Sequence, residues 1–250
     1  MTNQILSGKT AIITGAASGI GAAHARLFSQ QGANILLCDI QQELGRALAD
    51  ELKGNGGKAE FFNLDVSSGE QWQAAVDTAV SLFGGVTTLV NSAGIVSPAG
   101  AEKETMEGWQ KVVATNQTGI WLGMKTVLPE LVKSGNSAIV NIASMLGVIA
   151  SPGAFAYQAT KGAIRQMTKS VALEYGSRGV RANTVCPGVI ETPMSAGGSE
   201  QIRQMQINAT TLKRFGQPID VANCSLFLCS DMAAYVTAID MLVDGGTSAA

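Results

Sequence analysis

Tyr157 and Lys161 lie four positions apart in a segment whose pattern predicts a helix, and together they offer proton-transfer chemistry. This spacing places both side chains on one helical face. A phenol ordinarily loses its proton near pH ~10, and a neighbouring ammonium favours the phenolate. We therefore expect Lys161 to lower the pKa of Tyr157, so that the phenol exchanges protons nearer to neutral pH. Alone, the pair also fits a solvated helix face, so its interpretation depends on the rest of the chain.

A glycine-rich turn near the N-terminus offers a second chemistry. Residues 14–21 read Thr-Gly-Ala-Ala-Ser-Gly-Ile-Gly and lie between a predicted strand and a predicted helix. Such a turn lets backbone N–H groups approach a pyrophosphate at the helix N-terminus. Its glycine spacing differs from the usual G-x-G-x-x-G dinucleotide fingerprint. The context of strand, turn and helix still predicts a phosphate-binding turn.

Asp39 ends the second predicted strand, where an acid can accept hydrogen bonds from an adenosine ribose and would repel a 2′-phosphate. Residues 15–21 and 40–42 contain no Arg or Lys. These charges favour NAD over NADP as the cofactor. The alternative for Asp39 is a turn or cap residue.

The elements that must position these residues alternate along the chain. Continuous apolar runs alternating with helices predict an α/β protein, a single-domain Rossmann fold over residues 1–250. Its doubly wound parallel sheet has about seven strands with helices on both faces. Strands are predicted at residues 10–13, 34–38, 60–63, 88–90, 138–142, 180–185 and 238–243. Helices are predicted at about residues 19–31, 41–52, 105–133 and 153–176 and after residue 67 or 68, with a kink or break at Pro129. The irregular residues 188–213 predict a substrate lid, with a simple surface loop as the alternative.

Composition excludes several classes of function. The 250 residues carry a net charge of −2, which predicts no nucleic-acid partner. No apolar run is long enough for a membrane span, and residues 1–8 lack the features of a signal peptide, so we expect a cytoplasmic protein. Cys38, Cys186, Cys224 and Cys229 form no Cys-x-x-Cys pair, which predicts reduced thiols and no metal site. The single histidine, His24, is paired with no nucleophile in any motif, and we interpret it as structural.

Several separate motifs occur together and in a fixed order. They are the 14–21 turn, Leu64-Asp65-Val66, Asn91-Ser92-Ala93-Gly94, Asn116, Ser144, Tyr157-x-x-x-Lys161, Pro187-Gly188 and Val243-Asp244-Gly245-Gly246. With them the chain resembles the short-chain dehydrogenase/reductases from about residue 8 to residue 246. It is most similar to the branch of NAD-dependent hydroxysteroid and cyclic secondary alcohol dehydrogenases. One departure is Ser92, where the family usually has a second asparagine, and we expect a local repacking there.

The resemblance implies a set of cofactor contacts. Around the pyrophosphate and its ribose it places Gly15, Ser18, Gly19, Ile20 and Gly21, with Asp39 on the adenosine ribose and Asp65 and Val66 at the adenine. Along the middle and the nicotinamide it places Asn91, Ala93, Gly94, Tyr157, Lys161, Pro187, Gly188, Val189 and Thr192.

The resemblance also implies the catalytic residues Asn116, Ser144, Tyr157 and Lys161, with Tyr157 as the general acid or base. Asn116 is implied to help hold a water that connects Lys161 to solvent. Ser144 follows the fifth strand, at the sheet edge where ligands bind, and its hydroxyl can bond a substrate oxygen.

The expected substrate is a neutral, hydrophobic secondary alcohol or its ketone, with cyclic alcohols included. The residues expected to border its pocket, beside Ser144 and Tyr157, are mostly apolar and include no Arg or Lys: Ile95, Val96, Met145, Leu146, Phe155, Val189 and Met194. One alternative is a 3-oxoacyl-(acyl-carrier-protein) reductase, against which Asp39 argues. Another is a non-catalytic cofactor sensor or scaffold, against which the complete Ser-Tyr-Lys set argues.

The resemblance implies a homotetramer or dimer as well. We expect the apolar side chains of the Tyr157 helix to pack between subunits, through Ala163, Ile164, Met167 and Val171.

Overall fold

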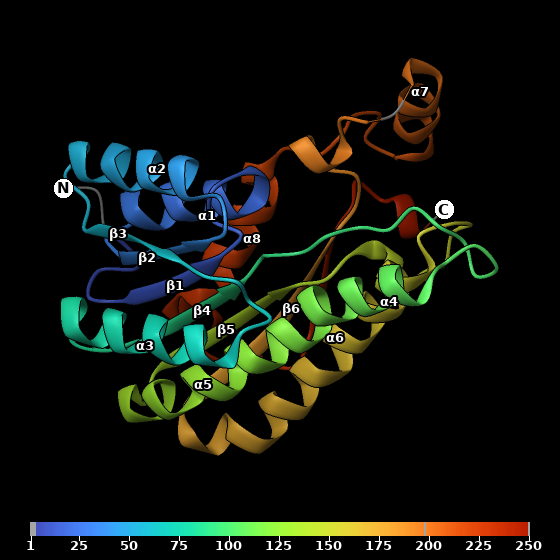
Figure 1. The fold of residues 1–250 in the computed structure, drawn as a ribbon. Coiled ribbons are helices and arrows are strands. Elements are labelled where there is room, and N and C mark those ends of the chain that lie inside the picture. The colour runs from blue at the N-terminus through green and yellow to red at the C-terminus, as the bar shows by residue number, and fades with distance from the viewer. Residues whose placement is uncertain (1–3, 198, 250) are drawn as a thin grey trace.

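The computed structural model describes residues 4–197 and 199–249. Residues 1–3, part of the N-terminal segment expected to lack a signal peptide, and Gly198 of the predicted lid lie outside the described residues. The strands form one parallel sheet of seven, in the order β3-β2-β1-β4-β5-β6-β7. The strand order reverses between β1 and β4, and ligands bind at such a switch point, outside the carboxyl ends of the strands. This confirms the predicted α/β Rossmann-like sheet (Figure 1).

The strands follow the predicted apolar runs to within two residues at each end. They are β1 Thr10–Thr14, β2 Asn34–Asp39, β3 Ala59–Asn63, β4 Thr88–Asn91, β5 Ser137–Ile142, β6 Val180–Pro187 and β7 Asp240–Val243. The α-helices are α1 Gly19–Gln30, α2 Gln42–Gly54, α3 Gly69–Phe83, α4 Met106–Val113, α5 Gly119–Ser134, α6 Phe155–Tyr175, α7 Glu200–Ala209 and α8 Pro218–Cys229.

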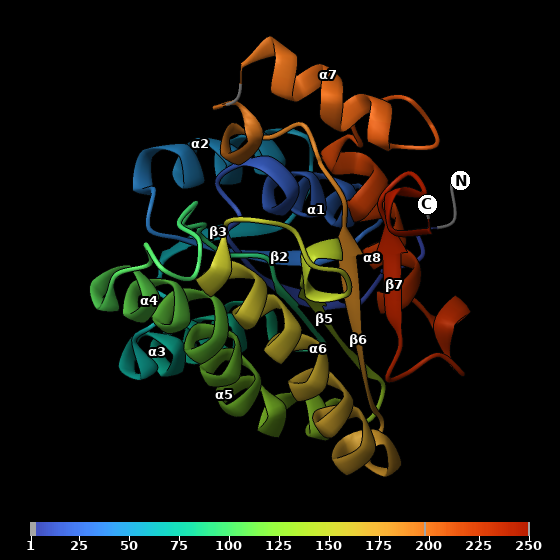
Figure 2. The same ribbon diagram turned by 90° about the vertical axis from the view of Figure 1, so that its right-hand side faces the viewer.

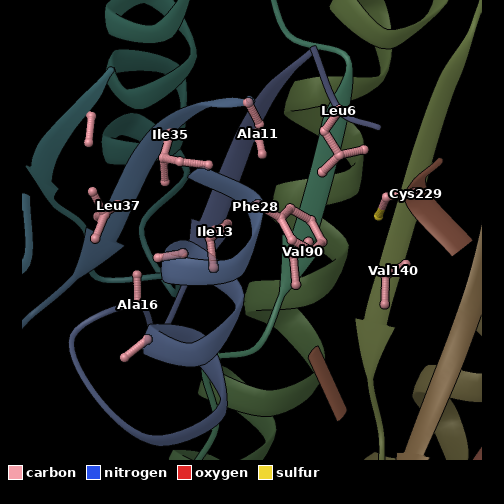
Figure 3. Close-up of a cluster of buried hydrophobic side chains, with 14 of the residues drawn as sticks. Leu6, Ala11, Ile13, Ala16, Phe28, Ile35, Leu37, Val90, Val140 and Cys229 are labelled. Atoms are coloured by element: carbon pink, nitrogen blue, oxygen red, sulfur yellow. The ribbon is translucent and has the colours of Figure 1, made fainter. Parts of the chain in front are cut away.

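Two hydrophobic cores lie on opposite faces of the sheet. Adjacent strand residues point to opposite faces, so Ile13 packs with the core under α1, α2 and α8, whereas Ile12 packs under α3, α5 and α6. Figure 3 shows the first core, in which Phe28 of α1 meets strand side chains such as Val90. The second core surrounds the fully buried Trp72, whose indole N–H donates to the Val66 carbonyl at 2.9 Å. Because helices cover both faces of the sheet, a ligand can reach mainly the carboxyl ends of its strands.

The prediction of one long helix over residues 105–133 is wrong at one place within it. A π-helical segment, Ala114–Thr118, separates α4 from α5, and Asn116 lies inside it. A π-turn inserts one extra residue and often marks a functional site. Pro129, by contrast, lies within α5, which continues to Ser134 without a break.

The structure also adds two helices that the sequence pattern did not predict. Both lie C-terminal to β6: α7 within the predicted lid, and α8, which covers the sheet beside α1. In Figures 1 and 2, α7 stands apart from the helices that cover the sheet. The described residues of α7 include no buried side chain, so little packing fixes its position.

Candidate active site

A cavity of about 760 Å³ lies along the carboxyl edge of the sheet. Its walls come from the ends of six strands and the segments after them: residues 15, 18–21, 39–41, 64–67, 92–96, 142–146 and 187–190. Segments that leave neighbouring parallel strands meet at one edge, which explains how residues so far apart in sequence share one cavity.

One end of this cavity is built from backbone. A Cβ at Gly21 would lie 2.0 Å from the Gly15 carbonyl oxygen, so only glycine allows the turn to fold this tightly. Ser18 is the N-cap of α1 but its side chain accepts no capping bond, and the first turn carries no acidic residue. The first N–H groups of α1 therefore keep no side-chain cap and are suited to an anion such as a pyrophosphate.

Asp39 is buried beside this turn. One carboxylate oxygen accepts the Ala17 N–H at 3.0 Å, and the other accepts the Gln41 N–H at 2.9 Å. Asp39 lines the cavity, as does Ile40, which is 67% exposed. The carboxylate therefore supports the turn while it faces the cavity.

The predicted adenine and middle contacts divide into two groups. Asp65, Val66, Ala93 and Gly94 line the cavity. Asn91 does not line it: its side-chain amide is buried and donates to the Asn141 side chain at 2.8 Å. Asn91 thus ties β4 to β5 and supports the cavity wall from behind. The same cavity is lined by Pro187, Gly188, Val189 and Thr192, which were predicted at the nicotinamide.

The other end of the cavity brings Ser144, Tyr157 and Lys161 together. Ser144 caps a 3₁₀ turn, Met145–Gly147, and its hydroxyl accepts the Leu146 N–H at 3.1 Å. The Lys161 ammonium lies 5.4 Å from the centre of the Tyr157 ring and donates to the Ile142 carbonyl at 2.8 Å. One hydroxyl, one phenol and one amine therefore converge on the same space.

The charge states of this group differ from our expectation. Burial raises the pKa of Tyr157, and the Ser144 hydroxyl opposes this only in part. Burial also lowers the pKa of Lys161 to about 8. The pKa of Tyr157 in the protein alone therefore lies above its ordinary value, against the expected lowering, because desolvation outweighs the hydrogen bond with Ser144.

Asn116 reaches this end from the π-helical segment but does not line the cavity. Its side-chain oxygen accepts the Ile95 N–H at 2.8 Å, and its amide donates to the Ile95 carbonyl at 2.9 Å. The amide also donates to the Thr160 hydroxyl at 3.3 Å. Asn116 thereby ties the segment after β4 to α6, next to Lys161.

Most of the predicted pocket residues line the cavity. They are Ile95, Val96, Met145, Leu146, Val189 and Met194. Phe155 does not line it and packs instead against Trp109, with 6.0 Å between the ring centres. Side chains two positions apart on a helix point to nearly opposite sides, so Phe155 faces away from the side on which Tyr157 lies.

The cavity wall also includes residues that were not predicted at the site, among them Lys111, Thr115 and Gln206. Lys111 corrects the expectation of a pocket without cations, although its side chain is exposed. Gln206 belongs to α7. The sequence signal for this helix is its N-cap Ser199, whose hydroxyl accepts the Ile202 N–H.

His24 lies behind the phosphate end and outside the cavity. It is fully buried, its Nδ1 pairs with the Ile20 carbonyl at 2.7 Å, and burial lowers its pKa to about 4. Over residues 4–197 and 199–249, no three His, Cys, Asp or Glu side chains gather as metal ligands would. In the same residues, no helix combines the length and apolar character that crossing a membrane requires.

Fold and site together define an oxidoreductase of the dinucleotide-binding α/β class. Residues 15–248 match the family model described as enoyl-(acyl carrier protein) reductase. The chain is 47% identical over 248 residues to 2,5-dichloro-2,5-cyclohexadiene-1,4-diol dehydrogenase from Sphingobium indicum, covering 99% of each chain. It is 41% identical to 3-alpha-(or 20-beta)-hydroxysteroid dehydrogenase from Mycobacterium tuberculosis, covering 98% of this chain and 91% of the relative.

Cyclopentanol dehydrogenase from Comamonas testosteroni is 37% identical, with 96% of this chain and 97% of the relative covered. A 3-oxoacyl-[acyl-carrier-protein] reductase from Thermotoga maritima is 39% identical over 96% and 98% of the two chains. The chain belongs to the short-chain dehydrogenase/reductase family, and it is an enzyme that interconverts alcohols and ketones.

Proposed function

We propose that this enzyme uses NAD(H) to interconvert a neutral, hydrophobic secondary alcohol, including cyclic ones, and its ketone. One observation carries the proposal. Ser144, Tyr157 and Lys161 share a single cavity with an uncapped helix N-terminus and with the carboxylate of Asp39. That cavity therefore joins a proton-transfer group to a dinucleotide-binding edge.

When bound, the nicotinamide ring supplies the hydride chemistry. In the oxidation direction, the Tyr157 phenolate removes the hydroxyl proton of the alcohol, and in reduction the phenol returns it. The Ser144 hydroxyl holds the substrate oxygen and shares its developing charge. Lys161, beside the Tyr157 ring, favours the phenolate once a second positive charge, that of the oxidised cofactor, lies in the cavity.

Asp39 supports the choice of NAD. A 2′-phosphate at this position would meet a buried carboxylate and the exposed Ile40, with no cation among residues 39–41. Like charges at close range in a partly desolvated site repel strongly. The adenosine ribose of NAD instead offers hydroxyl donors to the same carboxylate.

The substrate proposal rests on the apolar wall formed by Ile95, Val96, Met145, Leu146 and Met194. Three relatives carry names of dehydrogenases that act on a cyclic diol, a hydroxysteroid or cyclopentanol, which supports the same class here.

We further propose that residues 188–213 close over the substrate as a lid. Met194 and Gln206 from this segment line the cavity, whereas α7 has no buried residue in its described part. Such a segment can open for exchange and close to exclude water.

A homotetramer or dimer is our proposed assembly. The expectation that Ile164 packs at the subunit interface is wrong, because this side chain is fully buried in the second core. Leu173 of α6 is 82% exposed, and Met106 and Trp121 on α4 and α5 are exposed as well, which supports a subunit contact along these helices. Light scattering that gives the mass of a monomer would contradict the proposed assembly.

We also propose the cytoplasm as the compartment. The four cysteines are all free, which supports this proposal.

A panel of secondary alcohols and ketones, assayed with NAD(H) and NADP(H), tests the proposed substrate and cofactor. We expect turnover of cyclic alcohols such as cyclopentanol with NAD⁺ and much weaker turnover with NADP⁺. The alternative is a 3-oxoacyl-(acyl-carrier-protein) reductase, which the name of one relative supports. A preference for acyl thioesters with NADPH would establish that alternative.

A further inference from the structure

Arg165 of α6 lies one helical turn beyond Lys161 and outside the cavity. Its guanidinium donates in two directions. Its Nη1 donates to the Gly147 carbonyl. Its Nη2 donates at 2.9 Å to a carboxylate oxygen of Asp240, the first residue of β7. Arg165 therefore connects three segments: the turn after β5, α6 and β7.

Asp240 holds the guanidinium from the far side. The same carboxylate oxygen accepts the Lys169 ammonium at 2.6 Å, and the Asp240 side chain is only 14% exposed. Burial alone would raise the pKa of Asp240, but hydrogen bonds from Arg165 and Lys169 lower it below its ordinary value. The carboxylate is thus charged at neutral pH and keeps Arg165 in place.

The bonding pattern is poorly suited to stability alone. The strongest arginine–carboxylate pairs are two-pronged, with both oxygens of the carboxylate engaged. Here the Arg165 Nε and the second Asp240 oxygen are buried and have no partner among the described residues. Such an incomplete pair is weak evidence for a stabilising role. The guanidinium instead gives one of its donors to a carbonyl in the turn.

That turn carries Ser144. The Gly147 N–H donates to the Ser144 carbonyl at 2.9 Å, and the Ser144 hydroxyl accepts the Leu146 N–H at 3.1 Å. A Cβ at Gly147 would lie 2.6 Å from the Lys161 carbonyl oxygen, so the turn rests directly on the backbone of α6. Fixing the Gly147 carbonyl therefore fixes Ser144 relative to Tyr157 and Lys161.

We infer that Arg165, held by Asp240, is a positioning residue for Ser144: it clamps the Met145–Gly147 turn onto α6 and so sets the distance between the serine hydroxyl and the Tyr157 phenol. The inference rests on the proposed role of Ser144. An error of about 1 Å in such a distance can reduce turnover roughly 100-fold.

A double-mutant cycle with a cyclic secondary alcohol and NAD⁺ tests this inference. Arg165→Met should lower kcat roughly 10- to 100-fold, with the Kd for NAD⁺ unchanged. In a Ser144→Ala background the same change should have little further effect, because residues that act as a unit are not additive. Arg178→Met is the matched control: Arg178 follows α6, stacks on the Tyr175 ring and should leave kcat unchanged.

Two further variants keep the inference testable if Arg165→Met fails to fold. Asp240→Asn keeps a neutral acceptor and should lower kcat in the same direction but less. Arg165→Ala should recover part of its kcat when guanidinium ion is added at a concentration that leaves the wild type unaffected.

Full additivity of the Arg165 and Ser144 effects, or a wild-type kcat in Asp240→Asn, would overturn the inference while leaving the proposed function intact. A Ser144→Ala enzyme with unchanged kcat would instead refute the proposed role of Ser144, and the inference with it.

Discussion

The phosphate end and the proton-transfer end of the cavity are built from different parts of the polypeptide. At the phosphate end, glycines and the start of α1, which no side chain caps, form the surface together with the carboxylate of Asp39. At the other end, side chains arrive from the Ala114–Thr118 segment, from the turn after β5 and from α6. The first end depends on local backbone shape, whereas the second depends on hydrogen bonds between distant segments.

This difference implies that the two ends respond differently to mutation. Damage to the phosphate end should appear mainly in cofactor affinity, because the backbone there contacts the ligand. Damage to the proton-transfer end should appear in turnover or in overall stability.

Asn116→Ala should give the largest loss of stability. It removes the partners of both Ile95 backbone groups in a buried site. Each unsatisfied buried group costs about 1–3 kcal/mol, so we expect a total of roughly 2–6 kcal/mol. Urea unfolding measures it, with the exposed Asn55→Ala as the control. Equal midpoints for the two variants would contradict the role of Asn116 as a tie between segments.

His24, which lies behind the phosphate end, should make the free energy of unfolding sensitive to acid. Its folded pKa of about 4 lies below its ordinary value of 6.5, so the unfolded chain binds the extra proton first. The stabilisation is complete above pH ~6.5 and is lost as the pH falls toward ~4, by up to about 3 kcal/mol. The free energy of unfolding of wild type and His24→Gln, measured from pH ~7 to pH ~5, should diverge in slope. Parallel curves would show that His24 does not titrate in this way.

Gly21→Ala should weaken cofactor binding and leave the chemistry at Tyr157 intact. The added Cβ would overlap the Gly15 carbonyl, and overpacking of this kind costs about 1–3 kcal/mol. If this whole free-energy cost weakens cofactor binding, the Kd for NAD⁺ rises roughly 5- to 150-fold. Calorimetry measures this, with Gly54→Ala as the control because nothing lies within 4 Å of its Cβ position. A wild-type Kd would contradict the tight turn as the phosphate site.

Asp39→Asn should have the smallest effect and act on cofactor choice. It keeps the size of the side chain and removes its charge, so we expect about 1 kcal/mol, or roughly a fivefold shift in kcat/KM from NAD toward NADP. Asp50→Asn, an exposed change on α2, is the control. A wild type that already prefers NADP would refute the electrostatic argument.

The phosphate end could be predicted from the sequence because its information is local. The glycines, Asp39 and the strands around them follow from short patterns, and the order of the motifs also brought Ser144, Tyr157 and Lys161 to the correct edge. The missed features depend on tertiary contacts. The π-helical segment at Asn116 and the Arg165 contact with Gly147 have no local signature. The raised pKa of Tyr157 depends on burial that no spacing rule contains.

Substitution of Tyr157 tests the central claim most directly. Turnover of a cyclic secondary alcohol and the Kd for NAD⁺ are compared in Tyr157→Phe and in Tyr175→Phe, a change on the same helix outside the cavity. We predict that Tyr157→Phe lowers kcat roughly 100- to 10,000-fold while NAD⁺ still binds, and that Tyr175→Phe leaves both quantities unchanged. A Tyr157→Phe enzyme with a kcat within about tenfold of the wild type would contradict Tyr157 as the proton-transfer group.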